Sequence, residues 1–170
     1  MNHSIILTHQ EIAHKTRRIA FQILEANHEA KEIVLAGICG NGYTFAKKIK
    51  TVLDEISDVA TTLCEIQLDK KNPLTEITTS IPVEAYSKKN LVLIDDVLSS
   101  GKTLIYGVKH FLNTEVNSIK TAVLVNRNHK NFPVKADFKG ISLSTSLLEH
   151  IEVDFSKEES VAYLCDVKPA

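Results

Sequence analysis

Short runs of almost entirely apolar residues recur along the chain, separated by segments with the periodicity of amphipathic helices. Residues 33–37 (IVLAG), 91–94 (LVLI) and 119–125 (IKTAVLV) are such runs, each suited to one buried strand. Strands that alternate with helices predict a mainly parallel sheet with helices on both faces. We therefore expect an α/β fold whose ligands bind beyond the carboxyl ends of the strands.

Helix signals lie between these runs. Thr8 and Glu11 have the spacing of a capping box, ahead of a helix that extends to about Asn27. Further helices are expected over residues 43–56 and 103–112.

The remaining segments complete the expected fold. Residues 59–68 are rich in β-forming residues, and the polar residues 69–80 (DKKNPLTEITTS) predict a mobile loop. Residues 151–156 and 161–167 predict two strands joined by a charged turn, which form a C-terminal β-hairpin.

Composition narrows the class of protein. The 170 residues suit one domain over residues 1–170, with 44% apolar and 24% charged residues as in an ordinary globular protein. A net charge of -1 predicts neither a nucleic-acid nor a membrane partner, and no apolar run is long enough to cross a bilayer. Three widely spaced cysteines and the absence of a secretory signal predict reduced thiols and a cytoplasmic location.

The sequence LVLIDDVLSSGKT at residues 91–103 carries the clearest chemical signal. Small residues around Gly101 let backbone N–H groups converge at the start of the next helix, whose dipole favours a phosphate. Asp95 and Asp96 repel phosphate, but carboxylates accept hydrogen bonds from ribose hydroxyls or bind hydrated magnesium. A sugar phosphate satisfies both halves of the motif.

Other nucleotide motifs fit less well. The phosphate loop of nucleotide triphosphatases needs a glycine at the position of Asp96, and the dinucleotide fingerprint needs another spacing than that of Gly37, Gly40 and Gly42. Acid pairs also follow a strand in phosphoacceptor domains, but earlier in the chain. A purely structural alternative is that Asp95 caps a turn.

Residues 91–103 resemble the phosphoribosyl pyrophosphate signature of the type I phosphoribosyltransferases. Residues 33–49 and 122–146 are similar to segments of a narrower group, the bifunctional pyrimidine operon attenuator and uracil phosphoribosyltransferase family. The resemblance extends from the first helix to about Ser146.

This resemblance implies an enzyme with a small hood beside its parallel sheet. It would transfer the 5-phosphoribosyl group from phosphoribosyl pyrophosphate to a nucleobase, a pyrimidine such as uracil, and release pyrophosphate in pyrimidine salvage. Magnesium is the implied cofactor, and such proteins are commonly homodimers. The transition state resembles an oxocarbenium ion, so the protein aligns the reactants and stabilises separating charge.

The resemblance also assigns roles to individual residues. The catalytic residues are Asp95, Asp96 and Arg127, and the two acids face the ribose hydroxyls and contact magnesium indirectly. The 5′-phosphate loop consists of Val97, Leu98, Ser99, Ser100, Gly101, Lys102 and Thr103. The pyrophosphate loop consists of Ile38, Cys39, Gly40, Asn41 and Gly42. The base region contains Val125, Asn126, His129, Val134 and Lys135.

The chain departs from the family pattern at these loops. Residues 39–42 read Cys-Gly-Asn-Gly where the family has Lys-Thr-Arg-Gly, and Asn126 replaces an acid. Lys70 and Lys71 are candidate substitutes for the two missing cations, without the bidentate fork of arginine. These changes motivate an alternative function, a catalytically weakened, nucleotide-sensing RNA-binding regulator of pyrimidine genes. The near-neutral charge favours the enzyme, because phosphate neutralisation dominates RNA affinity.

Three further features allow two interpretations each. His129 either contacts a base or phosphate or is an exposed loop histidine. Cys39 either has a lowered thiol pKa near a helix start or is simply a small residue. The lysines at 47, 48 and 50 form either a solvated helix face, which we favour, or an RNA contact.

Overall fold

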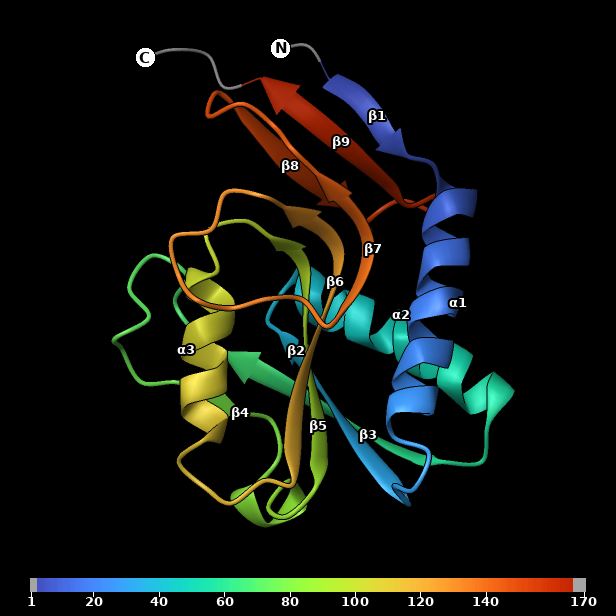
Figure 1. Ribbon diagram of the computed structural model, residues 1–170, viewed down its shortest axis with the longest axis vertical. Coiled ribbons are helices and arrows are strands. Elements are labelled where there is room, and N and C mark those ends of the chain that lie inside the picture. Colours follow the sequence, from blue (N-terminus) through green and yellow to red (C-terminus); the bar gives the residue numbers. More distant parts are fainter. Residues whose placement is uncertain (1–2, 167–170) are drawn as a thin grey trace.

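The computed structural model describes residues 3–166 (Figure 1). Its main element is a six-stranded sheet of strand order β4-β3-β2-β5-β6-β7, in which all neighbouring strands are parallel except the β3–β4 pair. The strands of this sheet are β2 (Glu32–Ile38), β3 (Ala60–Gln67), β4 (Thr78–Thr79), β5 (Asn90–Leu98), β6 (Ser118–Arg127) and β7 (Phe138–Leu143). The predicted mainly parallel α/β sheet is confirmed.

Helices cover both faces of this sheet, as the apolar strands require. The helices are α1 (His9–Ala26), α2 (Asn41–Ile56) and α3 (Lys102–Phe111), with the short 3-10 helix η1 (Val83–Ala85). In Figure 1, α1 and α2 lie on one side of the sheet and α3 on the other. Successive residues of β2 enter opposite cores: Leu35 packs with the residues of α1 and α2, and Val34 packs with those of α3.

The predicted capping box at the start of α1 is confirmed. The Thr8 hydroxyl accepts a hydrogen bond from the Glu11 N–H at 3.4 Å, and the Thr8 N–H donates to the Glu11 carboxylate at 2.8 Å. Two otherwise unpaired N–H groups are satisfied, which fixes the first turn of the helix. Ile12, Ile19 and Ile23 form its buried face.

A second, three-stranded antiparallel sheet lies at one end of the molecule (top of Figure 1), with the order β1-β9-β8. It joins β1 (His3–Leu7) to the hairpin of β8 (Glu149–Asp154) and β9 (Val161–Asp166). The predicted hairpin is confirmed, although residue 167 of its second strand lies outside the described residues. In the described part of the chain, no helix has the length and apolar character needed to cross a membrane.

Four strands differ from the sequence prediction. Strands β1 and β7 were not predicted, and β4 lies within the expected loop of residues 69–80. Strand β5 also continues past Ile94 to Leu98, because Asp95 and Leu98 remain paired with β6. The two acids therefore belong to the carboxyl end of the strand itself rather than to the loop that follows it.

Candidate functional site

The candidate site lies where two adjacent parallel strands, β2 and β5, end and lead into α2 and α3. The loops after these strands contain the predicted pyrophosphate and phosphate residues. Because parallel strands present their carboxyl ends on the same edge, the fold brings the two loops together.

The carboxyl group of Asp95 is almost completely buried, with 3% of the residue exposed. Its Oδ1 accepts a hydrogen bond from the Asp96 N–H at 3.0 Å. Burial and, secondly, the charge of neighbouring Asp96 raise the pKa of the Asp95 carboxyl to about 8. Asp96 is half-buried, so it is the more accessible carboxylate of the pair.

A cation from the loop after β3 stands beside this acid pair. Lys70 Nζ lies 3.6 Å from Asp95 Oδ1, and its charge partly offsets the rise in the pKa of that carboxyl. The neighbouring Lys71 carbonyl accepts a hydrogen bond from Lys102 Nζ at 3.5 Å. The loop of residues 69–77 therefore reaches both the acid pair and the start of α3.

Asn41, the first residue of α2, connects the two loops. Its side-chain amide donates hydrogen bonds to Asp96 Oδ2 at 3.0 Å and to the Val153 carbonyl of β8 at 2.8 Å. Asn41 thereby orients the accessible carboxylate and ties it to the three-stranded sheet. No sequence signal assigned this role to it.

Two glycines in the β2–α2 loop allow the close approach of these loops. A Cβ at Gly42 would lie 2.9 Å from both Asp95 Oδ1 and the Ile94 carbonyl oxygen, so only glycine fits. Gly40 has φ 84° and precedes α2, where no side chain of the described residues caps the helix. Ile38 is buried in the core, and Cys39 Sγ lies 3.7 Å from the Leu68 carbonyl, as expected of a small packed residue.

The β5–α3 loop surrounds a hollow of about 70 Å³. Its lining residues are Asp95, Val97, Leu98, Ser99, Ser100, Gly101, Lys102, Thr103 and Leu104. Ser100 Oγ accepts a hydrogen bond from the Lys102 N–H at 3.2 Å, and Gly101 adopts φ 85° as the residue before α3. This small concave loop at a helix N-terminus has the form of an anion site.

The segment that follows β6 packs directly onto the β5–α3 loop. The N–H groups of Asn131 and Phe132 donate to the Ser100 carbonyl at 2.8 and 3.1 Å. A Cβ at Gly101 would approach Val134 Cγ1 to 2.6 Å, so the glycine is required for packing as well as for its φ. Val134, which the sequence assigned to the base region, therefore packs against Gly101 of the β5–α3 loop.

Arg127, at the end of β6, joins the phosphate loop to the segment after β7. Its guanidinium donates to Ser99 Oγ at 3.2 Å, Thr145 Oγ1 at 2.6 Å and the Ser146 carbonyl at 2.8 Å. The ring of His129 also bonds the Thr145 carbonyl. Sequence reasoning gave no role to Thr145 or Ser146, although the polar run STS at the end of the resembling segment was a visible signal.

The other residues of the predicted base region do not lie beside Arg127, His129 and Val134. The Val125 side chain is fully buried in the core, and Lys135 is largely exposed, with its Nζ 3.7 Å from Asp137 Oδ1. Asn126 is buried and donates to Ser142 Oγ at 3.1 Å, while its Oδ1 has no hydrogen-bond partner within residues 3–166. A cavity of about 400 Å³ lies nearby. It is lined by Ser99, Ser100, residues 127–131 and Leu147.

The chain is similar to known proteins over most of its length. The chain is 30% identical to a bifunctional protein PyrR of Clostridium novyi over 166 residues, which cover 92% of this chain and 93% of that protein. It is 32% identical to a bifunctional protein PyrR of Streptomyces coelicolor, over 97% of this chain and 90% of that protein.

Solved structures share the fold at lower sequence identity. A hypoxanthine-guanine phosphoribosyltransferase of Bacillus anthracis superposes with a TM-score of 0.76 at 15% identity, covering 97% of this chain and 100% of the other. A hypoxanthine phosphoribosyltransferase of Trypanosoma cruzi gives the same TM-score at 16% identity, with 98% and 97% covered. The phosphoribosyl transferase domain family matches residues 2–159. The chain therefore belongs to the phosphoribosyl transferase domain family.

Proposed function

We propose that the protein transfers the 5-phosphoribosyl group from phosphoribosyl pyrophosphate to a pyrimidine base such as uracil, and releases pyrophosphate. The observation that carries this proposal is the juxtaposition at the β5 end. The half-buried carboxylate of Asp96 directly precedes the loop that surrounds a hollow and leads into α3. This pairing suits a ligand with hydroxyls and a phosphate a few bonds apart.

The 5′-phosphate would bind in the hollow of the β5–α3 loop. Backbone N–H groups at the start of α3 and the hydroxyls of Ser100 and Thr103 supply its hydrogen-bond donors. The carboxylate of Asp96 would accept hydrogen bonds from the ribose hydroxyls, in the orientation that Asn41 fixes. Positioning of this kind is the main catalytic task in a transfer that asks little covalent chemistry of the protein.

The pyrophosphate would bind at the uncapped start of α2. Its first N–H groups and the glycines at 40 and 42 allow the backbone to approach the anion closely. Residues 38–42 contain no lysine or arginine, so Lys70 would supply positive charge from the neighbouring loop. A lysine acts there as a point charge, whereas the family's arginine would form a bidentate pair.

The acid pair also fits a magnesium ion. Hard divalent cations prefer oxygen ligands, and a cation would relieve the repulsion that helps to raise the pKa of Asp95. Asp96, with Asp95 behind it, would hold the ion through its waters. When bound, magnesium would neutralise charge on the departing pyrophosphate.

The base would occupy the cavity lined by Ser99, Ser100, residues 127–131 and Leu147, with Arg127 and His129 at its edge. The pyrimidine preference rests on the resemblance of residues 122–146 to the pyrimidine family. The hypoxanthine enzymes that share the fold make purine bases the competing substrates to test.

The test is pyrophosphate release from phosphoribosyl pyrophosphate and magnesium with a panel of uracil, cytosine, hypoxanthine and guanine. We expect turnover with uracil above the other bases, and a loss of at least about tenfold in kcat/KM in Asp96→Asn, because a hydrogen bond to a charged group contributes about 1.5–3 kcal/mol. Asp58→Asn, an exposed position at the amino ends of the strands, is the matched control. Turnover with a purine alone overturns the pyrimidine assignment, and no turnover with any base in folded protein overturns the enzyme.

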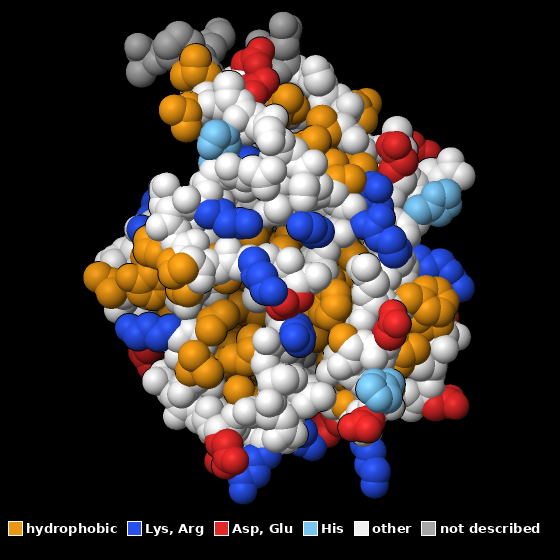
Figure 2. All heavy atoms as spheres, in the orientation of Figure 1, with side chains coloured by type: hydrophobic (Ala, Val, Ile, Leu, Met, Phe, Trp, Pro, Cys, Tyr) orange, Lys and Arg blue, Asp and Glu red, His pale blue; other side chains and the backbone are white. Residues whose placement is uncertain are grey.

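We propose RNA binding as a second function of this chain. Two observations favour it: the curated relatives are named bifunctional, and Figure 2 shows Lys and Arg side chains gathered across the middle of one face. Filter binding of pyrimidine-operon leader RNA should weaken steeply as salt rises, because phosphate contacts release counterions. Negligible retention at low salt contradicts this second function and leaves the enzymatic proposal intact.

A further inference from the structure

A row of His, Cys and Glu side chains crosses the three-stranded sheet, away from the site at the β5 end. Cys165 lies on the central strand β9, directly opposite His3 of β1 on one side and His150 of β8 on the other. Residues directly opposite in antiparallel strands point to the same face, and Glu152, two residues after His150, shares that face. The pairing register thus gathers four donor side chains from both ends of the chain.

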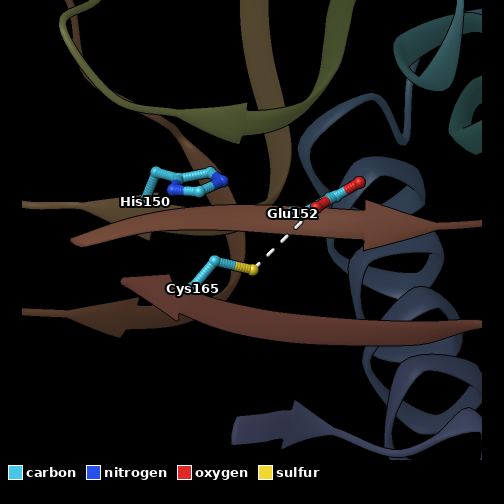
Figure 3. Close-up of side chains that lie close together, drawn as sticks. All are labelled: His150, Glu152 and Cys165. Carbon is cyan, nitrogen blue, oxygen red and sulfur yellow. Dashed lines mark hydrogen bonds between the residues drawn. The ribbon is translucent and has the colours of Figure 1, made fainter. Parts of the chain in front are cut away.

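Three of the four donor atoms are already close to one another, and the fourth, on His3, contacts the sulfur. The ligand atoms of His150, Glu152 and Cys165 all lie within 4.8 Å of one another (Figure 3). On the other side of the sulfur, His3 Nδ1 lies 3.1 Å from Cys165 Sγ, which in turn is 3.9 Å from Glu152 Oε2. A tetrahedral zinc ion, with bonds of about 2.0–2.3 Å, separates its ligand atoms by roughly 3.3–3.7 Å.

The surroundings of the sulfur differ from those of a core cysteine. Cys165 is only 1% exposed, yet His3, His150 and Glu152 are all exposed. The buried thiol therefore lies against polar side chains that are themselves exposed. Thiolate, imidazole and carboxylate groups are the three side-chain ligand types that bind zinc in proteins, and all three are present here.

We propose that His3, His150, Glu152 and Cys165 form a binding site for one transition-metal dication of the zinc class. The thiolate and imidazole ligands select against magnesium and calcium, which prefer oxygen donors alone. Binding replaces the thiol proton, and the hydrogen bond between His3 and Cys165 gives way to two bonds to the metal.

The proposed site has a structural consequence. Strand β1 pairs with β9, and β9 with β8, so an ion bound by residues from all three strands ties the start of the chain to the hairpin. The same hairpin presents the Val153 carbonyl, next to Glu152, to Asn41 of the nucleotide site. The metal would therefore stabilise the sheet that holds the Val153 carbonyl in place for its hydrogen bond with Asn41.

The test uses the full chain, without a histidine tag, stripped of metal and kept reduced with a phosphine. Zn²⁺ alone is titrated by calorimetry, and Co²⁺ alone by absorption. We expect one ion per chain, a thiolate-to-cobalt charge-transfer band, and a higher midpoint of thermal unfolding with Zn²⁺, because the ion binds only the folded state.

Variants separate this site from adventitious surface binding. Cys165→Ser should abolish the charge-transfer band, and His150→Ala and Glu152→Gln should each weaken Zn²⁺ binding by at least about tenfold, the lower limit for losing even an outer-shell partner. His28→Ala, an exposed histidine after α1, is the control and should bind as the unaltered chain does. His150→Ala and Glu152→Gln alter exposed positions, so they keep the test valid if Cys165→Ser fails to fold.

Two results would overturn the site. One is the absence of stoichiometric binding by the reduced protein. The other is binding that Cys165→Ser, His150→Ala and Glu152→Gln all leave unchanged. Both results are independent of pyrophosphate release, so the failure of this site is distinguishable from failure of the proposed transferase.

Discussion

The side-chain amide of Asn41 donates a hydrogen bond of 3.0 Å to Asp96 Oδ2, which joins the β2–α2 loop to the end of β5. The same amide bonds the Val153 carbonyl at 2.8 Å, so one side chain holds three elements together. The orientation of the accessible carboxylate at the candidate site thus depends on a residue that stands where the family that the sequence resembles has an arginine.

Asn41→Ala should weaken the binding of phosphoribosyl pyrophosphate. It removes a hydrogen bond to a charged group, worth about 1.5–3 kcal/mol, so we expect KM to rise roughly tenfold or more while the protein stays folded. Steady-state kinetics and circular dichroism measure the two effects. Asn113→Ala, an exposed position after α3, is the control. An unchanged KM would show that Asn41 does not orient Asp96.

Gly42→Ala should destabilise the protein and displace Asp95. The new methyl group would meet both Asp95 Oδ1 and the Ile94 carbonyl at 2.9 Å. Such overpacking costs about 1–3 kcal/mol, which urea unfolding resolves. Gly40→Ala is the comparison, because its added methyl group meets no atom within 4 Å and its cost comes from the backbone at φ 84°. Turnover preserved in Gly42→Ala would contradict the close packing of the two loops.

The raised pKa of Asp95 predicts how stability varies with pH. Its pKa rises from 3.8 in the unfolded chain to about 8 in the folded chain, so the folded state keeps a proton that the unfolded state loses. The contribution of this carboxyl to the free energy of unfolding is therefore most favourable below about pH 4, and it declines as pH rises toward 8. Asp95→Asn removes that decline.

Urea unfolding between pH 5 and 8 measures this effect. We expect the free energy of unfolding of Asp95→Asn to increase relative to that of the unaltered chain as pH increases. The curve for Asp58→Asn should stay parallel to the curve for the unaltered chain. If the two curves for Asp95→Asn and the unaltered chain stay parallel, the carboxyl is ionised throughout and burial does not control it.

Arg127→Lys should lower activity although it keeps the charge. The guanidinium donates to Ser99, Thr145 and Ser146 from three nitrogen atoms, a geometry that an ammonium cannot reproduce. We expect kcat/KM to fall about tenfold in Arg127→Lys and further in Arg127→Ala. Arg17→Lys, an exposed position on α1, should have no effect. Full activity in Arg127→Lys would mean that charge alone is required.

The sequence predicted those strands and helices that have a clear local sequence pattern. Residues 33–37 and 91–94 are nearly all apolar, which identifies strands buried on both faces, and the Thr8–Glu11 capping box marks the start of α1. Strand β7 was missed because Gly140 interrupts its pattern. That glycine is required by a contact with the neighbouring strand β6, since a Cβ there would collide with the Leu124 carbonyl oxygen.

The contacts that complete the two sites depend on pairing between distant segments. The residues that line the hollow of the β5–α3 loop were predictable as a group because one continuous motif contains nearly all of them. The bonds from Asn41 to Asp96 and from His129 to Thr145, and the row from His3 to Cys165, join residues that only the folded chain brings together. The pairing register of β1 with β9 places His3 opposite Cys165. Local sequence patterns do not specify a register between residues that are 162 positions apart.

The most direct test of the central claim is calorimetric titration of the full chain with ribose 5-phosphate, with and without magnesium. The account predicts one site per chain, and at least about tenfold weaker binding in Asp96→Asn than in Asp58→Asn, because only Asp96 accepts the ribose hydroxyls. No heat from the unaltered protein, or equal affinity in the two variants, would contradict the claim that the end of β5 binds a phosphorylated ribose.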